Sequence, residues 1–205
     1  VDIQQATSLS FIVESLLQRL SWPSRQGEES KVEHEEEGSS HLPKVSAPVS
    51  EDKQKELVKR VFAYAFVWSL GASLNTEDWD QFDRYTRDIF SESSFSIQFP
   101  MQGTVFNYFV SLDVQEDVQQ GGLFREWASI LPSFQYEPSM PYFQLVVPTK
   151  DTCRFSYLMK HMLTVDKPVF ITGVTGTGKT VMTQALLKEL APPREEGGLN
   201  IVSVV

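Results

Sequence analysis

Residues 173–180 have the sequence Gly173-Val174-Thr175-Gly176-Thr177-Gly178-Lys179-Thr180. This run matches the phosphate-binding pattern G-x-x-x-x-G-K-[ST] in full, so we expect all eight residues to bind nucleotide. The apolar residues 168–172 before it predict a buried strand, and residues 181–190 after it, which lack Gly and Pro, predict a helix. Strand, glycine loop and helix in this order predict a P-loop α/β module with a parallel sheet.

The loop predicts how a polyphosphate would be held. Gly176 and Gly178 can take positive φ without Cβ strain, so the amides from Val174 to Thr180 can curl around an anion. The first amides and the dipole of the following helix favour negative charge at the same place. We expect Lys179 to bridge the β- and γ-phosphates of ATP or ADP, and the Thr180 hydroxyl to ligate Mg²⁺. The alternative is a Gly/Thr-rich turn followed by a surface lysine.

No candidate catalytic residue follows the loop. A P-loop NTPase also needs a carboxylate at the end of a later strand to hold Mg²⁺, and a group that positions the attacking water. Glu189, Glu195 and Glu196 lie in the predicted helix or in the polar turn after it, and none follows an apolar strand. A second strand-like run starts at Asn200 and continues to the last residue given, Val205. We therefore expect a truncated module that cannot hydrolyse ATP unaided.

Composition limits the possible partners. The net charge is −9 and no basic stripe occurs, which argues against a nucleic-acid partner. The longest apolar run, residues 61–72, is too short to span a bilayer, so no membrane partner is expected. Six Glu accompany one Lys between Glu28 and Glu37. A solvated, disordered insertion explains this stretch better than an acidic docking tail does.

Four segments are expected along the chain. Residues 1–23 predict an amphipathic helix that Trp22-Pro23 ends. Residues 24–50 form the acidic insertion. Residues 51–140 predict a mostly helical region, and a boundary near residues 138–141 separates it from the P-loop module in residues 141–205. The predicted fold class is thus an α/β P-loop NTPase fragment with an incomplete parallel sheet, preceded by a mostly helical region.

Shorter elements are predicted within the last two segments. A helix at Glu51–Leu70 becomes apolar all round in its second half, which indicates burial on most sides, and Gly71 would end it. A cap at Asn75 or Thr76 starts the next helix. Its apolar stripe is Trp79, Phe82, Thr86, Ile89 and Phe90. Further on, we predict a strand at residues 104–110, a helical turn at 124–127, a strand at 142–149 and a helix at 152–163.

Five pieces of this sequence together resemble part of the motor region of a dynein heavy chain. The stretch Val147-Pro148-Thr149-x-Asp151-Thr152-x-Arg154, joined to Trp68-Ser69-Leu70-Gly71, makes the resemblance specific, whereas the P-loop alone is generic. The resemblance covers about residues 57–205. The matching pieces are residues 66–72, 82–85, 103–109, 147–158 and 173–180.

The resemblance implies a ring of AAA+ modules in one heavy chain. Residues up to about 140 would belong to the second module, with residues 51–140 as its helical closing part. Residues 141–205 would open the third module, whose nucleotide site regulates the motor while the first module performs the main hydrolysis. The resemblance also implies that Val146–Thr149 lies beside the adenine. The Walker B acid, the sensors and the arginine finger would lie outside this sequence.

The resemblance implies a motor ATPase that moves cilia or flagella, and such a motor has further partners. These are the other AAA+ modules of the same heavy chain, the dynein intermediate and light chains, and microtubules contacted by distant parts of the parent. The implied location is the cytoplasm and cytoskeleton, with the ciliary axoneme favoured because most heavy chain paralogues are axonemal. Two alternatives stay open: a truncated, non-catalytic nucleotide-binding or interaction module, and part of another AAA+ remodelling ATPase.

Overall fold

The computed structural model describes residues 3–18, 49–92, 94, 96–112, 115–134, 136, 138, 147–193 and 198–201. Several predictions lie outside these residues. They are the acidic insertion up to residue 48, the helix stop at Trp22-Pro23, most of the segment boundary, the strand at residues 142–146 and the last strand-like residues, 202–205.

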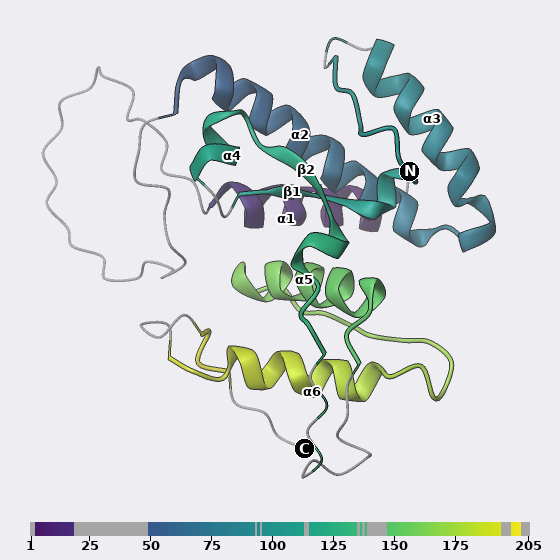
Figure 1. Ribbon diagram of the computed structural model, residues 1–205, viewed down its shortest axis with the longest axis vertical. Coiled ribbons are helices and arrows are strands. Elements are labelled where there is room, and N and C mark those ends of the chain that lie inside the picture. The colour runs from purple at the N-terminus through teal and green to yellow at the C-terminus, as the bar shows by residue number, and fades with distance from the viewer. Residues whose placement is uncertain are drawn as a thin grey trace, which may run out of the picture.

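Helices dominate the described part of the chain, as Figure 1 shows. In the N-terminal half, α1 (Ile3–Leu17) packs along α2 (Glu51–Leu70), and α3 (Trp79–Glu92) follows two short 3₁₀ helices at Gly71–Ser73 and Thr76–Asp78. Two later helices, α5 (Lys150–Thr164) and α6 (Lys179–Leu190), lie side by side beneath this half. The predicted helices at residues 51–70, 152–163 and 181–190 are confirmed. No helix in the described ranges combines the length and the apolarity needed to cross a bilayer.

The described residues contain one small sheet. Strands β1 (Tyr108–Ser111) and β2 (Leu123–Glu126) pair antiparallel, from Tyr108 opposite Glu126 to Ser111 opposite Leu123. The helix α4 (Gln115–Gln119) and a glycine turn join them, and 3₁₀ helices at Val105–Asn107 and Trp127–Ile130 flank them.

Two local predictions here need correction. The predicted strand at residues 104–110 is a strand only from Tyr108, because a 3₁₀ turn precedes it. The predicted helical turn at residues 124–127 was wrong, because three of its four residues belong to β2. Pairing with β1, which is distant in sequence, outweighs the local helical tendency of so short a run.

The predicted strand at residues 168–172 is not confirmed, since this segment pairs with no strand in the part of the chain that the structure describes. It connects α5 to α6, and Phe170 is 91% exposed. A strand needs a hydrogen-bonded neighbour. The predicted neighbours at residues 142–146 and 202–205 are outside the described residues. The parallel sheet is thus not present in the part of the chain that the structure describes.

One hydrophobic core fills the N-terminal half. The second half of α2 is buried as its sequence predicts, and it packs against α1, β1 and the 3₁₀ helices. A Cβ atom on Gly71 would come 2.5 Å from Cε1 of Phe82 and 2.7 Å from Cζ of Phe106, so only glycine permits this close approach. Along α3, Thr86 and Phe90 are buried, whereas Ile89 of the predicted stripe is exposed.

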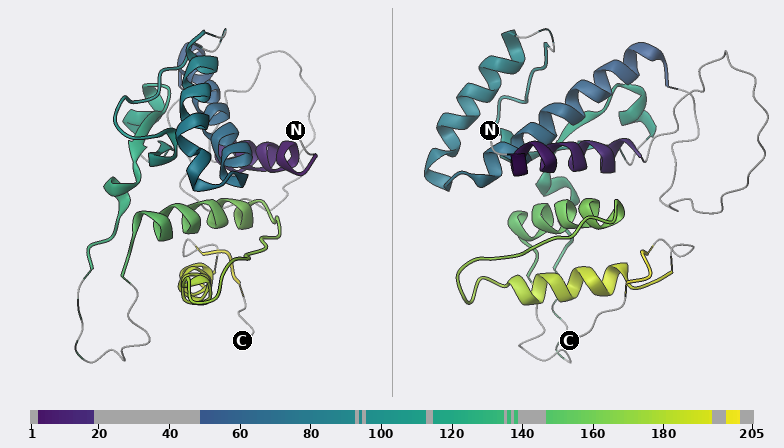
Figure 2. Two further views of the ribbon diagram at one scale, coloured as in Figure 1. Left: turned by 90° about the vertical axis from the view of Figure 1, so that its right-hand side faces the viewer. Right: turned by 180° about the vertical axis from the view of Figure 1, so that it is seen from behind.

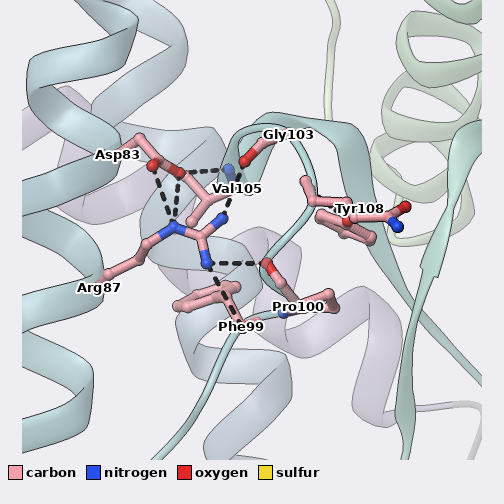
Figure 3. A network of polar contacts seen from close by, with 8 residues as sticks. Asp83, Arg87, Phe99, Pro100, Gly103, Val105 and Tyr108 are labelled. Atoms are coloured by element: carbon pink, nitrogen blue, oxygen red, sulfur yellow. Dashed lines mark hydrogen bonds and ion pairs between the residues drawn. The ribbon is translucent and has the colours of Figure 1, made fainter.

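A polar network ties α3 to the loop that enters β1 (Figure 3). Arg87 pairs with Asp83 at 3.0 Å and donates to the carbonyl oxygens of Pro100 at 2.8 Å and Gly103 at 3.1 Å. Asp83 also accepts the amide of Val105 at 2.6 Å. Burial raises the pKa of the Tyr108 hydroxyl, which stays protonated and donates to the Gln102 carbonyl in the same loop. Arg87 and Asp83 thus hold this loop, which has no regular secondary structure at Pro100 and Gly103, against α3.

We predict that Arg87→Met lowers the free energy of unfolding by about 2–3 kcal/mol, because it breaks an ion pair and leaves carbonyl oxygens without donors. Chemical denaturation followed by circular dichroism measures this loss. Arg84→Met on the same helix is the matched control, since Arg84 is exposed. Equal stabilities of the two variants would contradict a structural role for the network.

Candidate phosphate-binding site

The glycine loop adopts the bent backbone that its sequence predicts. Gly173, Gly176 and Gly178 have positive φ values of 146°, 83° and 78°. A Cβ atom built at Gly176 or Gly178 would meet no heavy atom within 4 Å. Backbone conformation, and not crowding, therefore requires glycine at these two positions.

The N-terminus of α6 presents backbone amides without a side-chain cap. Its N-cap residue is Gly178, and the first helical hydrogen bond runs from the Met182 amide to the Gly178 carbonyl at 2.9 Å. The amides of residues 179–181 precede that bond, and the first turn contains no acidic residue. Such a helix start favours an anion through both its donors and its dipole.

The N-terminus of α5 shows the opposite arrangement. Thr149 and Thr152 form a capping box, in which the Thr149 hydroxyl accepts from the Thr152 amide at 3.1 Å and Thr152 accepts from the Thr149 amide at 2.8 Å. Asp151 adds a negative charge to its first turn. Side chains thus cap the start of α5, whereas the start of α6 has no side-chain cap.

The structure brings Lys179 onto the loop. Its ammonium group donates to the Val174 carbonyl at 2.5 Å and to the Thr177 hydroxyl at 3.2 Å, while Thr177 donates to Val174 at 3.0 Å. The side chains of Thr175 and Thr180 are exposed beside it. A positive charge therefore lies among the glycines at the start of α6, which is the chemistry that a phosphate chain requires.

A groove lies between α5 and α6, and Met182 in the first turn of α6 is part of its lining. It has a volume of about 370 Å³, and the connector that precedes α5 forms part of its wall. Lys160 and Glu189 form an ion pair of 2.6 Å across it. The groove is lined by Ile130, Pro132, Pro148, Thr152, Cys153, Ser156, Tyr157, Lys160, Met182, Ala185, Leu186 and Glu189.

The sequence analysis missed this groove. The available signal was the spacing of Thr152, Ser156 and Lys160, which are four residues apart and share one face of α5. The facing residues of α6, Met182 and Glu189, follow the same helical period. Neither pattern shows by itself that the two faces meet, because that depends on how the helices pack.

The single cysteine lies in this groove. Cys153 is half-buried, and burial raises the pKa of its thiol above the ordinary value. Within the described residues, no group of three His, Cys, Asp or Glu side chains could hold a metal ion.

A glycine loop that leads into an uncapped helix defines this chain as a P-loop protein. Two family models match it: the dynein heavy chain AAA lid domain over residues 1–128, and the P-loop containing dynein motor region over residues 134–197. The chain belongs to the dynein heavy chain family. This confirms the resemblance that the sequence motifs indicated.

Individual relatives are similar over most of this chain. Dynein axonemal heavy chain 2 of Homo sapiens is 33% identical over 161 residues, which cover 77% of this chain and 3% of the relative. Dynein axonemal heavy chain 6 of Homo sapiens is 30% identical over 146 residues, or 71% of this chain and 3% of the relative. The flagellar outer arm dynein alpha chain of Chlamydomonas reinhardtii is 26% identical over 142 residues, which cover 69% of this chain and 3% of the relative. This chain thus spans about 3% of the length of these relatives.

The raised pKa of Cys153 predicts a pH dependence for its alkylation. Thiolate is the reactive form, so in the folded chain the rate should reach half its maximum at a higher pH than for an unfolded thiol. Iodoacetamide labelling followed by mass spectrometry, across a pH series with and without urea, measures both midpoints. A folded midpoint at or below the unfolded one would contradict the burial of this side chain.

Proposed function

We propose that this chain is an ATP-binding segment of an axonemal dynein heavy chain, with residues 173–180 as the nucleotide site. The observation that carries the proposal is the start of α6. There, positive-φ glycines, three amides ahead of the first helical bond and the Lys179 ammonium group occur together. The match of residues 134–197 to a P-loop containing dynein motor region supports the same conclusion.

The residues of the loop have separate roles in this proposal. Lys179 exchanges its bonds to Val174 and Thr177 for oxygens of the β- and γ-phosphates, because a phosphate is the stronger acceptor. The amides at the start of α6 donate to the same phosphates. The exposed hydroxyl of Thr180 is the protein ligand proposed for Mg²⁺, an ion that neutralises phosphate charge when it is bound.

We place the adenine at the end of the groove formed by Pro148, Thr152 and Met182. Met182 lies in the first turn of α6, directly after the loop, and Pro148 lies in the segment expected beside the base. Apolar walls with a few hydroxyl groups suit a flat heterocycle that also forms hydrogen bonds. The segment before α5 would thus hold the base, and the loop would hold the phosphates.

The place of the chain in the motor follows as a proposal. Residues 1–140 belong to the second AAA+ module and residues 141–205 open the third, whose site regulates the motor. The lid family match ends at residue 128 and the P-loop family match begins at residue 134, which supports a division of the chain a few residues before residue 141. Hydrolysis needs a Walker B acid and an arginine finger from elsewhere in the ring.

The cellular role is proposed from the relatives. Their names describe axonemal, flagellar and ciliary dyneins. We therefore propose that the parent protein works in the ciliary or flagellar axoneme as a microtubule motor. Its partners would be the remaining AAA+ modules together with intermediate and light chains.

Removing the lysine charge tests the phosphate site. Lys179→Ala should weaken the binding of fluorescently labelled ATP at least tenfold, since a charge-assisted contact contributes about 1.5–3 kcal/mol. Lys188→Ala, in the last turn of the same helix, is the matched control and should bind as the unaltered chain does. Unchanged affinity in a folded Lys179→Ala variant would count against the loop assignment.

Alkylation of Cys153 tests the proposed position of the adenine. Saturating Mg-ATP should slow this alkylation several-fold, because an adenine bound in the groove would cover the wall that contains Cys153. Lys179→Ala, at the same nucleotide concentration, should show little protection. If labelled ATP binds normally while Cys153 reacts at an unchanged rate, the adenine lies elsewhere.

A further inference from the structure

The helix α5 lies between the lid segment, residues 1–128, and the helix that carries the P-loop. Figure 2 shows this arrangement in two views, with α5 between the N-terminal helices and α6. Its lower face meets α6 through buried Met159, which packs with Leu186 and Leu190, and through the Lys160–Glu189 ion pair. Its other face meets the core of the lid segment.

That other face carries an arginine that contacts two tryptophans of the lid segment. The guanidinium carbon of Arg154 lies 5.1 Å from the ring centroid of Trp79 and 5.8 Å from that of Trp68. Asp151, one turn earlier on α5, pairs with the guanidinium group. The Arg154 side chain is only 13% exposed, and its buried Nε atom has no hydrogen-bond partner among the described residues.

The two tryptophans belong to a rigid aromatic layer. Trp79 stacks on Phe106 with 4.1 Å between centroids, and Trp68 meets Phe106 and Trp127 edge to face. Trp127 is fixed in turn by a hydrogen bond of 3.0 Å from its indole nitrogen to the Phe106 carbonyl. A cation held against these rings has a defined position, because closely packed aromatic side chains cannot shift freely.

Simple apolar packing does not require a cation at this place. Burying a charge is unfavourable unless partners compensate for it, and an aliphatic side chain could cover the same indoles without that cost. The compensation here is directional, since an indole attracts a cation over its face. The indole nitrogens of Trp68 and Trp79 are buried and make no hydrogen bond with any residue that the structure describes. Arg154 from α5 contacts both rings through its guanidinium group.

We propose that Arg154 is a positioning residue for the nucleotide site. By fixing α5 on the aromatic layer of the lid segment, it also fixes α6 and the loop that begins it. The inference rests on the proposed binding of nucleotide at residues 173–180. Coupling between two sites is reciprocal, so bound nucleotide should in turn order the contact between α5 and the two tryptophans.

The test uses the full 205-residue chain and two measurements. Labelled Mg-ATP gives the affinity, and hydrogen–deuterium exchange of the peptide spanning Trp68 to Trp79 gives the order of the lid segment. In the unaltered chain, saturating Mg-ATP should slow exchange in this peptide. Arg154→Met should weaken binding at least fivefold, about the lower end of typical coupling, and abolish the slowing.

Matched variants separate positioning from folding. Arg84→Met removes an exposed arginine of α3 and should change neither measurement. Arg154→Lys keeps the charge but loses the planar guanidinium group. Its ATP affinity and its exchange response should therefore lie between those of the unaltered chain and of Arg154→Met. Trp79→Phe keeps an aromatic ring against Phe106, but phenylalanine attracts a cation less strongly than tryptophan does. This variant should therefore also bind ATP more weakly than the unaltered chain. These two variants keep the test valid if Arg154→Met does not fold.

The outcomes distinguish this inference from the proposed function. If the unaltered chain binds no labelled ATP, the nucleotide site itself is refuted. If it binds ATP, and folded Arg154→Lys and Trp79→Phe match it in affinity and in exchange, then Arg154 has no positioning role. Loss of affinity in both variants, with Arg84→Met unchanged, establishes that role.

Discussion

The structure depends on α5 having two packed faces. One face meets the aromatic core of the lid segment through Arg154 and Tyr157, and the other meets α6 through Met159 and the Lys160–Glu189 pair. Residues before and after the predicted segment boundary are therefore joined by side-chain packing and not by the chain alone. The loop that begins α6 takes its place in the molecule from this arrangement.

The backbone amides at the start of α5 and at the start of α6 are capped differently. At α5, the two threonine side chains accept hydrogen bonds from the amides of Thr149 and Thr152, and Asp151 adds a negative charge that disfavours an anion there. At α6, a glycine provides the N-cap and the amides stay available. The same local physics therefore gives one helix a start capped by side chains and the other a start whose amides can donate to a ligand. The groove between the helices is lined by Thr152 near the start of α5 and by Met182 in the first turn of α6.

Local features were predictable from the sequence, and distant contacts were not. The bounds of α2, the helical course of α5 and α6 and the positive φ of Gly176 and Gly178 follow from short-range rules. The strand β2 depends on pairing with β1, so the local pattern misled there. Pairing of residues 168–172 depends in the same way on other parts of the chain, which a local pattern does not contain. Similarly, Arg154 belongs to a recognised motif, but its position at Trp68 and Trp79 depends on how α5 packs against α2 and α3, which are distant in sequence.

A crystal or cryo-EM structure of the chain with Mg-ATP tests the central claim most directly. The account predicts that the phosphates lie against the amides of residues 179–181. It also predicts that the Lys179 ammonium group leaves the Val174 carbonyl and bonds to phosphate oxygens. A nucleotide bound elsewhere, with Lys179 still on Val174 and Thr177, would contradict it.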